Sequence, residues 1–244
     1  MARTAVNRAY HAPVDRTRGA DLQQLHVVVP LRNLRDGKSR LEGALEPERR
    51  EAVIAGMLRQ TLDVLAAWPA CRRVHVVSSD AAALALARAA GANALAEAEP
   101  AHLNRAIVTG IDAALASGAT AVLCLPADLP LLTPAALQTV LDAADAATAA
   151  GGGRPLVVAA PADARGGTNA LLLSPPDAIE PSFGEDSLAA HLAAAARADA
   201  TVQLVIEPTL GFDLDTLADL ARLETGQLEA LVRLGRDAAA TPSR

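Results

Sequence analysis

The sequence predicts an α/β fold with a mixed, mainly parallel sheet and helices on both of its faces. Short apolar runs such as Leu25–Leu31 alternate along the chain with segments of helical spacing such as Glu48–Ala67. Strands that alternate with helices imply right-handed crossovers and a mainly parallel sheet. The composition agrees, because 51% of the 244 residues are hydrophobic whereas only 2% are aromatic. A chain of this length suits one large domain.

The first half of the chain alternates strictly between strands and helices. The expected strands there are Leu25–Leu31, Arg73–Ser78, Asn93–Glu97 and Val122–Leu125. The expected helices are Glu48–Ala67, residues 79–91, His102–Ser117 and Pro134–Ala150. Gly118 directly follows the third of these helices, and glycine suits a helix C-terminal cap.

The second half, from Leu156 to Leu214, is richer in strands. The expected strands are Leu156–Ala160, Ala170–Ser174 and Val202–Glu207, with a short extended piece at Phe212–Asp213. The expected helices are Asp186–Ala198 and one last helix after Thr216, which forms a capping-box pattern with Asp219. We expect this half to add an antiparallel portion that closes one side of the site.

The two ends of the chain are expected to be flexible, so that residues 1–24 and 238–244 flank a single domain of residues 25–237. The first 24 residues are polar and lack the apolar core of a secretory signal. No apolar run reaches the roughly 18 residues of a membrane span. The two cysteines, Cys71 and Cys124, form neither a metal-binding spacing nor a disulfide framework. These features favour a cytoplasmic protein without a membrane partner.

Charge excludes one class of partner and leaves another open. The net charge of −6 and the scarcity of aromatic residues argue against nucleic-acid binding. An anionic substrate therefore needs a local basic cluster. The segment Pro30–Leu41 supplies one directly after the first strand, with Arg32, Arg35, Lys38 and Arg40. Such a loop can hold a triphosphate through its side chains, and the alternative is a solvated basic turn.

Carboxylates at the ends of extended segments are the candidate metal ligands. Asp128 follows the buried strand Val122–Leu125 and lies between two prolines, where it can hold a divalent cation against a phosphate. The alternative is a turn residue that caps the helix after Thr133. Asp213 and Asp215 are two residues apart, so in an extended segment both point to the same side. Asp213 is the stronger metal candidate, because Asp215 also suits the turn before Thr216.

A glycine-flanked anion site is expected in the second half. Glycines in Gly166–Asn169 and at Gly184 allow a ligand to approach the backbone closely. Ser187 begins a predicted helix, where free backbone N–H groups and the helix dipole favour an anion. The alternative is simple helix capping by Asp186 or Ser187. His191, one turn further on, faces either the same anion or the surface.

Three further polar residues are ambiguous. Asn104 can hydrogen-bond a base edge or a ribose, or it can be an ordinary residue at a helix N-terminus. Ser79 and Asp80 lie at a strand end and are open to the same two interpretations. Together with the basic loop and the carboxylates, these positions predict a site that binds a phosphate-rich nucleotide, a divalent cation and a second small anion.

A family resemblance rests on six segments taken in chain order: VPLRNLRDGKSRL, HLNRAI, LPADLPLL, GGTNALLL, FGEDS and DLDT. Their ordered combination resembles the guanylyltransferases that build the deazaflavin coenzyme F-420. The resemblance covers roughly Leu25 to Leu223. It implies a Rossmann-like nucleotidyltransferase fold of the nucleotide-diphospho-sugar transferase type. It also implies Mg²⁺-dependent transfer of GMP from GTP to phosphoenolpyruvate, 2-phospho-L-lactate or 3-phospho-D-glycerate, with release of pyrophosphate.

The resemblance also implies roles for individual residues. Lys38 and Arg40 would bind the triphosphate, Asp128 and Asp213 would hold Mg²⁺, and Thr168, Gly184 and Ser187 would hold the phosphorylated acid. We expect catalysis from Lys38, Arg40, Asp128 and Asp213, with Asp215 as a further metal ligand. The residues expected to contact the nucleotide are Pro30, Arg32, Lys38, Arg40, Ser79, Asp80 and Asn104. Two positions differ from the family pattern, His102 in place of Gly and Leu217 in place of Pro.

The implied partners are GTP, the phosphorylated acid and a downstream transferase that accepts the activated product, and a homodimer is left open. Two rival functions remain. One is transfer to a sugar phosphate or to molybdopterin, although those enzymes commonly have a glycine-rich first loop that this chain lacks. The other is a catalytically silent nucleotide-binding protein on the same fold.

Overall fold

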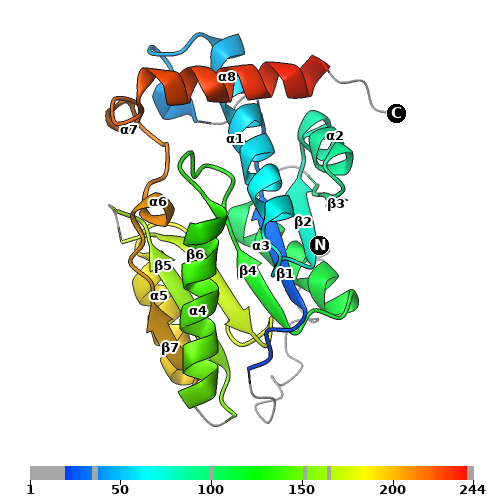
Figure 1. The fold of residues 1–244 in the computed structure, drawn as a ribbon, viewed down its shortest axis with the longest axis vertical. Helices are drawn as coiled ribbons and strands as arrows, with labels where there is room; N and C mark the ends of the chain where they lie inside the picture. The colour runs from blue at the N-terminus through cyan, green and yellow to red at the C-terminus, as the bar shows by residue number, and fades with distance from the viewer. Residues whose placement is uncertain (1–19, 35–37, 99–101, 151–152, 164–165, 241–244) are drawn as a thin grey trace, which may run out of the picture.

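The computed structural model describes residues 20–34, 38–98, 102–150, 153–163 and 166–240 (Figure 1). Of the flexible extension expected for residues 1–24, residues 1–19 lie outside the described residues. Residues 241–244 of the expected tail also lie outside them, whereas residues 238–240 belong to the last helix.

Seven strands form one sheet in the order β3-β2-β1-β4-β6-β5-β7. The strands are β1 (Leu25–Pro30), β2 (Arg73–Ser78), β3 (Asn93–Ala96), β4 (Ala121–Cys124), β5 (Leu156–Pro161), β6 (Thr168–Ser174) and β7 (Thr201–Leu204). β6 runs antiparallel to both of its neighbours, β4 and β5, whereas the other neighbouring pairs are parallel. The structure therefore confirms the mixed, mainly parallel sheet and the antiparallel portion in the second half.

Helices cover both faces of the sheet (Figure 1). They are α1 (Pro47–Ala67), α2 (Ala81–Ala89), α3 (Leu103–Ala116), α4 (Pro134–Ala150), α5 (Ser187–Arg197), α6 (Pro208–Gly211), α7 (Leu217–Leu220) and α8 (Thr225–Ala240), with a 3₁₀ turn at Ser39–Leu41. Apolar side chains of α1, α2 and α4 share one core with the sheet. Those of α3 and α5 belong to a second core on the opposite face.

The central strands are buried on both faces, which explains their uninterrupted apolar sequence. All six residues of β1 and all four of β4 are buried. Along β1 the side chains alternate, so Val27 and Val29 enter the first core while Val28 enters the second. The short apolar runs of the sequence therefore mark the middle of the sheet.

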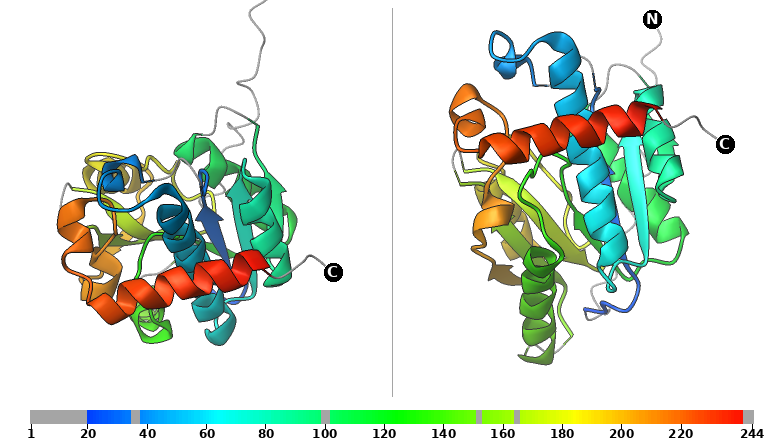
Figure 2. Two further views of the ribbon diagram at one scale, coloured as in Figure 1. Left: turned by 90° about the horizontal axis from the view of Figure 1, so that it is seen from above. Right: turned by 45° about the horizontal axis from the view of Figure 1, so that its top comes forward.

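Helix α8 lies across α1 at one end of the molecule (Figure 2). The crossing needs two glycines, because a Cβ on Gly56 would lie 2.0 Å from the Leu231 carbonyl oxygen and one on Gly235 would lie 1.9 Å from that of Ala52. The single helix expected after Thr216 is wrong, since α7 ends at Leu220 and α8 begins at Thr225. The capping box of Thr216 and Asp219 is present, and it begins α7.

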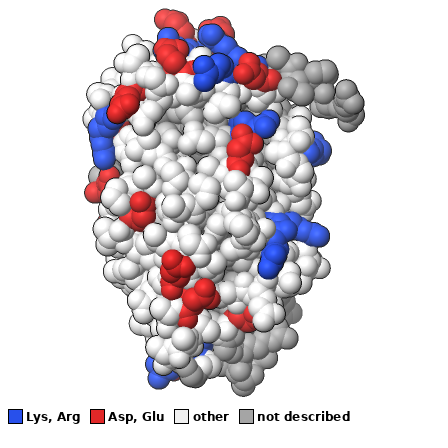
Figure 3. All heavy atoms as spheres, viewed as in Figure 1, with Lys and Arg blue, Asp and Glu red and all other residues white. Residues whose placement is uncertain are grey.

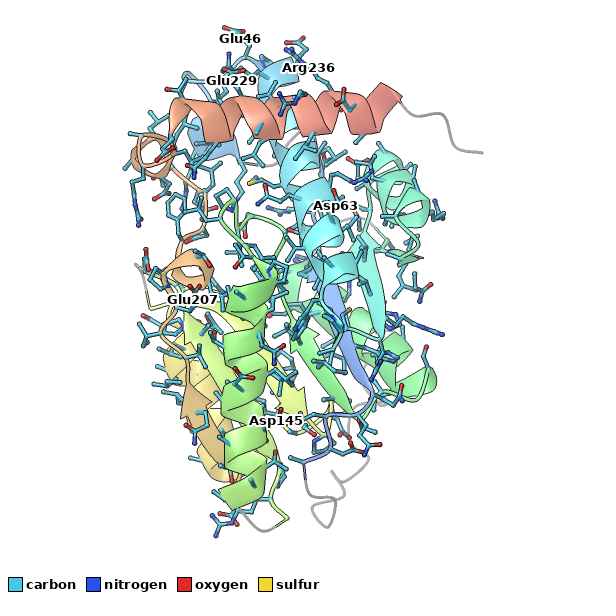
Figure 4. The ribbon with its side chains drawn as sticks, viewed as in Figure 1. Glu46, Asp63, Asp145, Glu207, Glu229 and Arg236 are labelled. Atoms are coloured by element: carbon cyan, nitrogen blue, oxygen red, sulfur yellow. The ribbon has the colours of Figure 1, made fainter. Side chains whose placement is uncertain are left out.

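A short helix replaces the end of one expected strand. β7 ends at Leu204, so the prediction that it continues to Glu207 is wrong. The Glu207 carboxylate instead accepts hydrogen bonds from the backbone N–H groups of Thr209 (2.8 Å) and Leu210 (2.9 Å) and thereby caps α6. Figure 4 shows Glu207 beside that helix. The extended piece expected at Phe212–Asp213 pairs with no strand among the described residues.

The molecular surface carries mixed charges. On the face seen in Figure 3, basic and acidic side chains are both present, and the densest group of charges lies at the end where α8 crosses α1. The exposed carboxylates Asp63 and Asp145 project outward from α1 and α4 (Figure 4). Among the residues that the structure describes, no helix combines the length and the apolar character that a membrane crossing requires.

Candidate active site

A cavity of about 370 Å³ opens at the carboxyl ends of β1 and β4. Because β6 is antiparallel to β4 and pairs Leu171 with Cys124, the first residues of β6 reach the same edge of the sheet. The lining residues are Pro30, Arg40, Leu103, Ile107, Cys124, Leu125, Pro126, Asp128, Ala162, Gly167, Thr168, Asn169, Phe183, Gly184, Glu185, Ser187, Asp213 and Asp215. Ligands bind at this edge in open α/β sheets.

The structure brings the mid-chain and late carboxylates together. The backbone N–H of Leu214 donates a hydrogen bond to the carbonyl oxygen of Asp128 at 3.0 Å, which ties the two segments side by side. Leu214 points into the core, whereas its neighbours Asp213 and Asp215 are partly exposed and line the cavity with Asp128. The alternation of an extended segment therefore places both late carboxylates on the side of the ligand.

Lys38 links two of these carboxylates. Its ammonium donates hydrogen bonds to Asp128 Oδ2, at 2.5 Å, and to Asp215 Oδ1. Burial lowers the pKa of Lys38, but the two carboxylates outweigh burial, so its pKa lies above the ordinary value. Lys38 therefore stays charged. The Asp215 side chain is thus engaged with Lys38, while its backbone N–H donates to Asp219 in the capping box.

Asp128 has one oxygen to spare. Its Oδ1 is buried and has no hydrogen-bond partner among the described residues. The alternative of a helix cap is not what the structure shows, because the Thr133 hydroxyl accepts the hydrogen bond from the Ala136 N–H at the start of α4. A buried carboxylate oxygen without a donor is costly unless a ligand satisfies it.

The donor set fits a Mg²⁺ ion that a nucleotide helps to hold. Within the described ranges, no three His, Cys, Asp or Glu side chains are grouped closely enough to hold a metal ion by themselves. Protein-bound Mg²⁺ commonly takes one or two carboxylates together with substrate phosphates and waters. The spare oxygen of Asp128 and the neighbouring carboxylate of Asp213 match that pattern.

The other residues of the basic segment differ in whether they line the cavity. Pro30 and the exposed Arg40 line it, whereas the exposed Arg32 is not among the lining residues. Arg35 lies outside the described residues. The segment before the loop is anchored from the end of β2: Ser79 Oγ donates to the Arg32 carbonyl oxygen at 3.2 Å, and Asp80 Oδ2 accepts from the Leu34 N–H at 2.9 Å.

Both carboxylate oxygens of Asp80 accept hydrogen bonds from backbone N–H groups. While Oδ2 holds Leu34, Oδ1 accepts from the N–H groups of Ala82 (2.8 Å) and Ala83 (3.3 Å) and caps α2. Neither Ser79 nor Asp80 is among the residues that line the cavity. Their observed contacts fix the start of the basic loop.

Hydroxyl groups also line the cavity. Thr168 at the start of β6 is 5% exposed, and Ser187 at the start of α5 is 1% exposed. Ser187 Oγ lies 3.3 Å from Thr168 Oγ1, and His191 Nδ1 lies 3.1 Å from the same atom. His191 is fully buried, so it faces Thr168 and not the surface.

The start of α5 differs from the expected site of free backbone donors. The N–H of Ser187 donates to Gly184 O at 3.3 Å, and the N–H of Leu188 donates to Gly166 O at 3.0 Å. Asp186 makes no side-chain capping bond among the described residues. Gly184 has a φ of 136°, which side-chain-bearing residues rarely adopt. Side-chain hydroxyls are therefore the more available donors on this side.

Asn104 holds the loop between Thr168 and Ser187 in place. Its Oδ1 accepts a hydrogen bond from the Phe183 N–H at 2.7 Å, and its Nδ2 donates to the Phe183 carbonyl at 3.0 Å. Both polar groups of Asn104 are thus directed at the backbone, and Asn104 is not among the lining residues, whereas Phe183, Gly184 and Glu185 are.

Sequence reasoning assigned no role to three residues that shape this site. Asn169 donates to the carbonyl oxygens of Leu210 (2.9 Å) and Gly211 (3.1 Å), which fixes the segment that leads to Asp213. Its position in the Gly166–Asn169 motif was the available signal. The apolar lining of Leu103 and Ile107 from α3 had none, because both fit ordinary helical spacing.

Solved structures with similar folds are nucleotidyltransferases. A candidate nucleotide-diphospho-sugar transferase from Desulfovibrio desulfuricans G20 aligns over 89% of this chain and 97% of its own, with a TM-score of 0.67 and 16% identity. A CMP:2-keto-3-deoxy-manno-octonic acid synthetase solved with CTP aligns over 82% and 96%, with a TM-score of 0.53 and 15% identity. At these identities the likeness shows the fold, and it confirms the expected nucleotidyltransferase fold.

Sequence relatives are more specific. The phosphoenolpyruvate guanylyltransferase of Rubrobacter xylanophilus is 46% identical over 197 residues, which cover 81% of this chain and 92% of the relative. The enzyme of the same name from Conexibacter woesei is 36% identical over 201 residues, or 80% and 85% of the two chains. The family model described as "Guanylyl transferase CofC like" matches residues 25–225. The chain is thus an enzyme of the CofC-like guanylyl transferase family.

Proposed function

We propose that this guanylyltransferase transfers GMP from GTP to a small phosphorylated acid, with phosphoenolpyruvate as the first candidate, in the biosynthesis of coenzyme F-420. The relatives named as phosphoenolpyruvate guanylyltransferases support this acceptor. One observation carries the proposal: a single cavity is lined both by carboxylates, two of which bind Lys38, and by buried hydroxyl groups. We call these the nucleotide end and the acceptor end.

The nucleotide end suits a triphosphate and its metal ion. Asp128 and Asp213 would hold Mg²⁺, with Asp215 beside them. When bound, the ion would supply positive charge at the α-phosphate and at the leaving pyrophosphate. Lys38 and Arg40 would neutralise charge on the leaving pyrophosphate, and Pro30 would line the nucleotide site. In this role Lys38 exchanges its carboxylate partners for phosphate oxygens.

The chemical step is an in-line displacement. A phosphate oxygen of the acid forms a bond to the α-phosphorus of GTP, the bond from that phosphorus to the bridging oxygen breaks, and pyrophosphate leaves. A phosphate monoester has a second pKa of about 6, so it is mostly a dianion at neutral pH and needs no general base. The residues of the protein therefore act by positioning and by charge neutralisation.

The acceptor end suits a small anion. The hydroxyls of Thr168 and Ser187 would donate hydrogen bonds to the acceptor, and the open backbone at Gly184 would let it approach closely. Leu103, Ile107 and Phe183 add apolar surface to the same cavity. This surface suits the carbon skeleton of a short acid.

The remaining nucleotide-binding candidates divide into two groups. Arg32 is exposed near the start of the basic loop. We propose that its side chain contacts the triphosphate when the nucleotide is bound. For Ser79, Asp80 and Asn104 we propose an indirect role, because their side chains bind the backbone of the segments that reach the cavity.

The wider setting is part of the proposal. The product joins GMP to the acid through a reactive diphosphate linkage, so a downstream transferase that accepts the activated acid must consume it. We also propose a cytoplasmic location and, as the notable alternative to a monomer, a homodimer. Light scattering on the purified chain distinguishes the two assembly states.

One assay tests the function. Pyrophosphate release is measured with GTP and Mg²⁺ against phosphoenolpyruvate, 2-phospho-L-lactate and 3-phospho-D-glycerate, with ATP and CTP in place of GTP as controls. We expect release with GTP and at least one of the acids, and none after chelation of the metal. Binding of GTP without release from any acid would instead identify a catalytically silent protein. A sugar phosphate tested in place of the acids covers the other rival, because release only with that acceptor would identify a different transferase.

A further inference from the structure

We propose that His191 is a positioning residue for the acceptor, which holds the Thr168 hydroxyl so that its proton is donated into the cavity. The inference rests on the proposed function, because the group that receives this proton is an oxygen of the phosphorylated acid. His191 itself lies behind the cavity wall and does not touch the acceptor.

The burial of His191 sets it apart from a surface residue. Its side chain on α5 is fully buried, and it is not among the residues that line the cavity. The ring of Phe183 meets it edge-on, with 5.0 Å between the ring centroids. A buried polar ring in such surroundings needs partners for both of its nitrogens.

Both nitrogens have partners, and these partners fix the position of the proton. The backbone N–H of Ser182 donates to Nε2 at 3.0 Å, so Nε2 acts as an acceptor and carries no proton. The proton of the neutral ring is then on Nδ1, which lies 3.1 Å from Thr168 Oγ1. Burial lowers the pKa of His191 to about 4, which keeps the ring neutral at physiological pH.

The tautomer determines what Thr168 can do. A hydroxyl has one proton to donate and two lone pairs that accept. Thr168 Oγ1 accepts from Nδ1–H of His191, so its own proton remains for another acceptor. Ser187 Oγ also lies close to it, at 3.3 Å, which is longer than the usual O–H···O distance. Ser187 is therefore weakly held and free to turn toward a ligand, while Thr168 is oriented before the ligand arrives.

A purely structural role for His191 makes a different prediction. In that case the important contact is the one with the Ser182 N–H, which ties the 182–186 loop to α5. Two substitutions separate the contacts, because an Asn amide reaches only as far as Nδ1 whereas a Gln amide reaches the position of Nε2. His191→Asn keeps a donor for Thr168, and His191→Gln keeps an acceptor for Ser182.

The experiment compares KM for phosphoenolpyruvate and KM for GTP in pyrophosphate-release assays of the full chain. We expect His191→Gln and His191→Phe to raise KM for phosphoenolpyruvate roughly tenfold, the cost of one misdirected hydrogen bond to a charged group. His191→Asn should stay within about threefold of wild type, and KM for GTP should not change. The matched control is His75→Phe, which alters another fully buried histidine that is outside the lining of the cavity and should leave both KM values unchanged.

A double-mutant cycle completes the test. If His191 acts through Thr168, then His191→Phe adds no further increase in KM to a Thr168→Val enzyme. Equal KM values for the Asn and Gln variants, a lower value for the Gln variant, or an additive cycle would overturn the positioning role. Wild-type enzyme that releases no pyrophosphate with any of the three acids overturns the proposed function, and the acceptor role of His191 falls with it.

Discussion

The two ends of the cavity hold charge in opposite ways. The nucleotide end concentrates ionised groups, with the Lys38 ammonium between Asp128 and Asp215. The acceptor end is built from neutral donors, with the hydroxyls of Thr168 and Ser187 and the buried ring of His191. Both ends lie at the same edge of one sheet, yet the first belongs largely to its parallel part and the second to the antiparallel strand β6.

The difference follows from what each end must bind. A triphosphate and its metal ion carry large charges that need countercharges, and these charges move when pyrophosphate leaves. The acceptor phosphate must instead keep its negative charge to act as a nucleophile. Neutral donors can orient it without neutralising it. Substitutions at the nucleotide end should therefore reduce kcat, whereas substitutions at the acceptor end should mainly raise KM for the acid.

Asp128 should give the largest effect. Asp128→Ala removes one of the two carboxylate partners of Lys38 and the buried oxygen that has no partner, so we expect kcat to fall about a thousandfold, as for other losses of transition-state charge stabilisation. Pyrophosphate release measures the loss, and circular dichroism checks that the fold is retained. Asp145→Ala is the matched control, because Asp145 is an exposed carboxylate on α4 (Figure 4). Normal turnover of the Asp128→Ala enzyme would refute a role in metal binding.

Substitution of Lys38 should give the second-largest loss of kcat. Lys38→Ala removes the only described ammonium that lies between the Asp128 and Asp215 carboxylates, and we expect kcat to fall about a hundredfold with a higher KM for GTP. KM for phosphoenolpyruvate should change little. Lys38→Arg should recover part of kcat, since it restores the charge but not the compact ammonium geometry. A loss confined to acceptor KM would remove the distinction between the two ends.

Substitution of Asn104 tests whether this residue serves the acceptor end or the nucleotide end. Asn104→Leu removes both hydrogen bonds to Phe183, so the loop before Ser187 loosens and KM for the acid should rise about threefold to tenfold. Steady-state kinetics with each substrate varied in turn measure the change. A rise in KM for GTP instead would show that Asn104 contacts the nucleotide, as the sequence alone also allowed.

The sheet and its main helices could be predicted from the sequence because local patterns determine them. Apolar runs marked the central strands, and helical spacing marked α1 and α4 to within one residue at each end. The break between α7 and α8 could not be predicted in this way. It depends on how α8 crosses α1 at Gly56 and Gly235, which are far apart in the chain.

The candidate site likewise has features that local patterns predict and features that depend on contacts between distant segments. The positions of Asp128 and Asp213 followed from strand ends and from the family resemblance, and the structure brings them into one cavity. The carboxylate partners of Lys38 could not be predicted, because Asp128 and Asp215 are 90 and 177 residues away. The burial of His191 was also not predicted, because its contacts are with Thr168 and Ser182, which lie on other segments of the chain. Contacts between distant segments decide such side-chain pairings.

The smallest effect concerns the pH dependence of stability, and it tests whether the acceptor end is neutral. Burial lowers the pKa of His191 to about 4, so the unfolded chain binds more protons than the folded one between about pH 4 and 6.5. Stability that is present above pH 6.5 is therefore lost as the pH falls through this window. Each such histidine contributes a slope of up to about 1.4 kcal/mol per pH unit. His75 has a pKa lowered to about 4 as well, by burial first and then by the charges of His26 and Arg73.

Urea denaturation at a series of pH values measures this slope. In His191→Asn one titrating group is gone, so the free energy of unfolding should fall less steeply between pH 6.5 and 4 than in wild type. His75→Asn should reduce the slope similarly while leaving the acceptor KM unchanged, because His75 is buried between β1 and β3 on strand β2 and away from the cavity lining. Identical slopes for wild type and His191→Asn would mean that His191 takes up its proton at the same pH in the folded and the unfolded chain. Below about pH 6.5 the folded ring would then be charged, Nδ1 and Nε2 would both be donors, and Nε2 could not accept from Ser182. In that pH range the acceptor end would carry a cation like the nucleotide end.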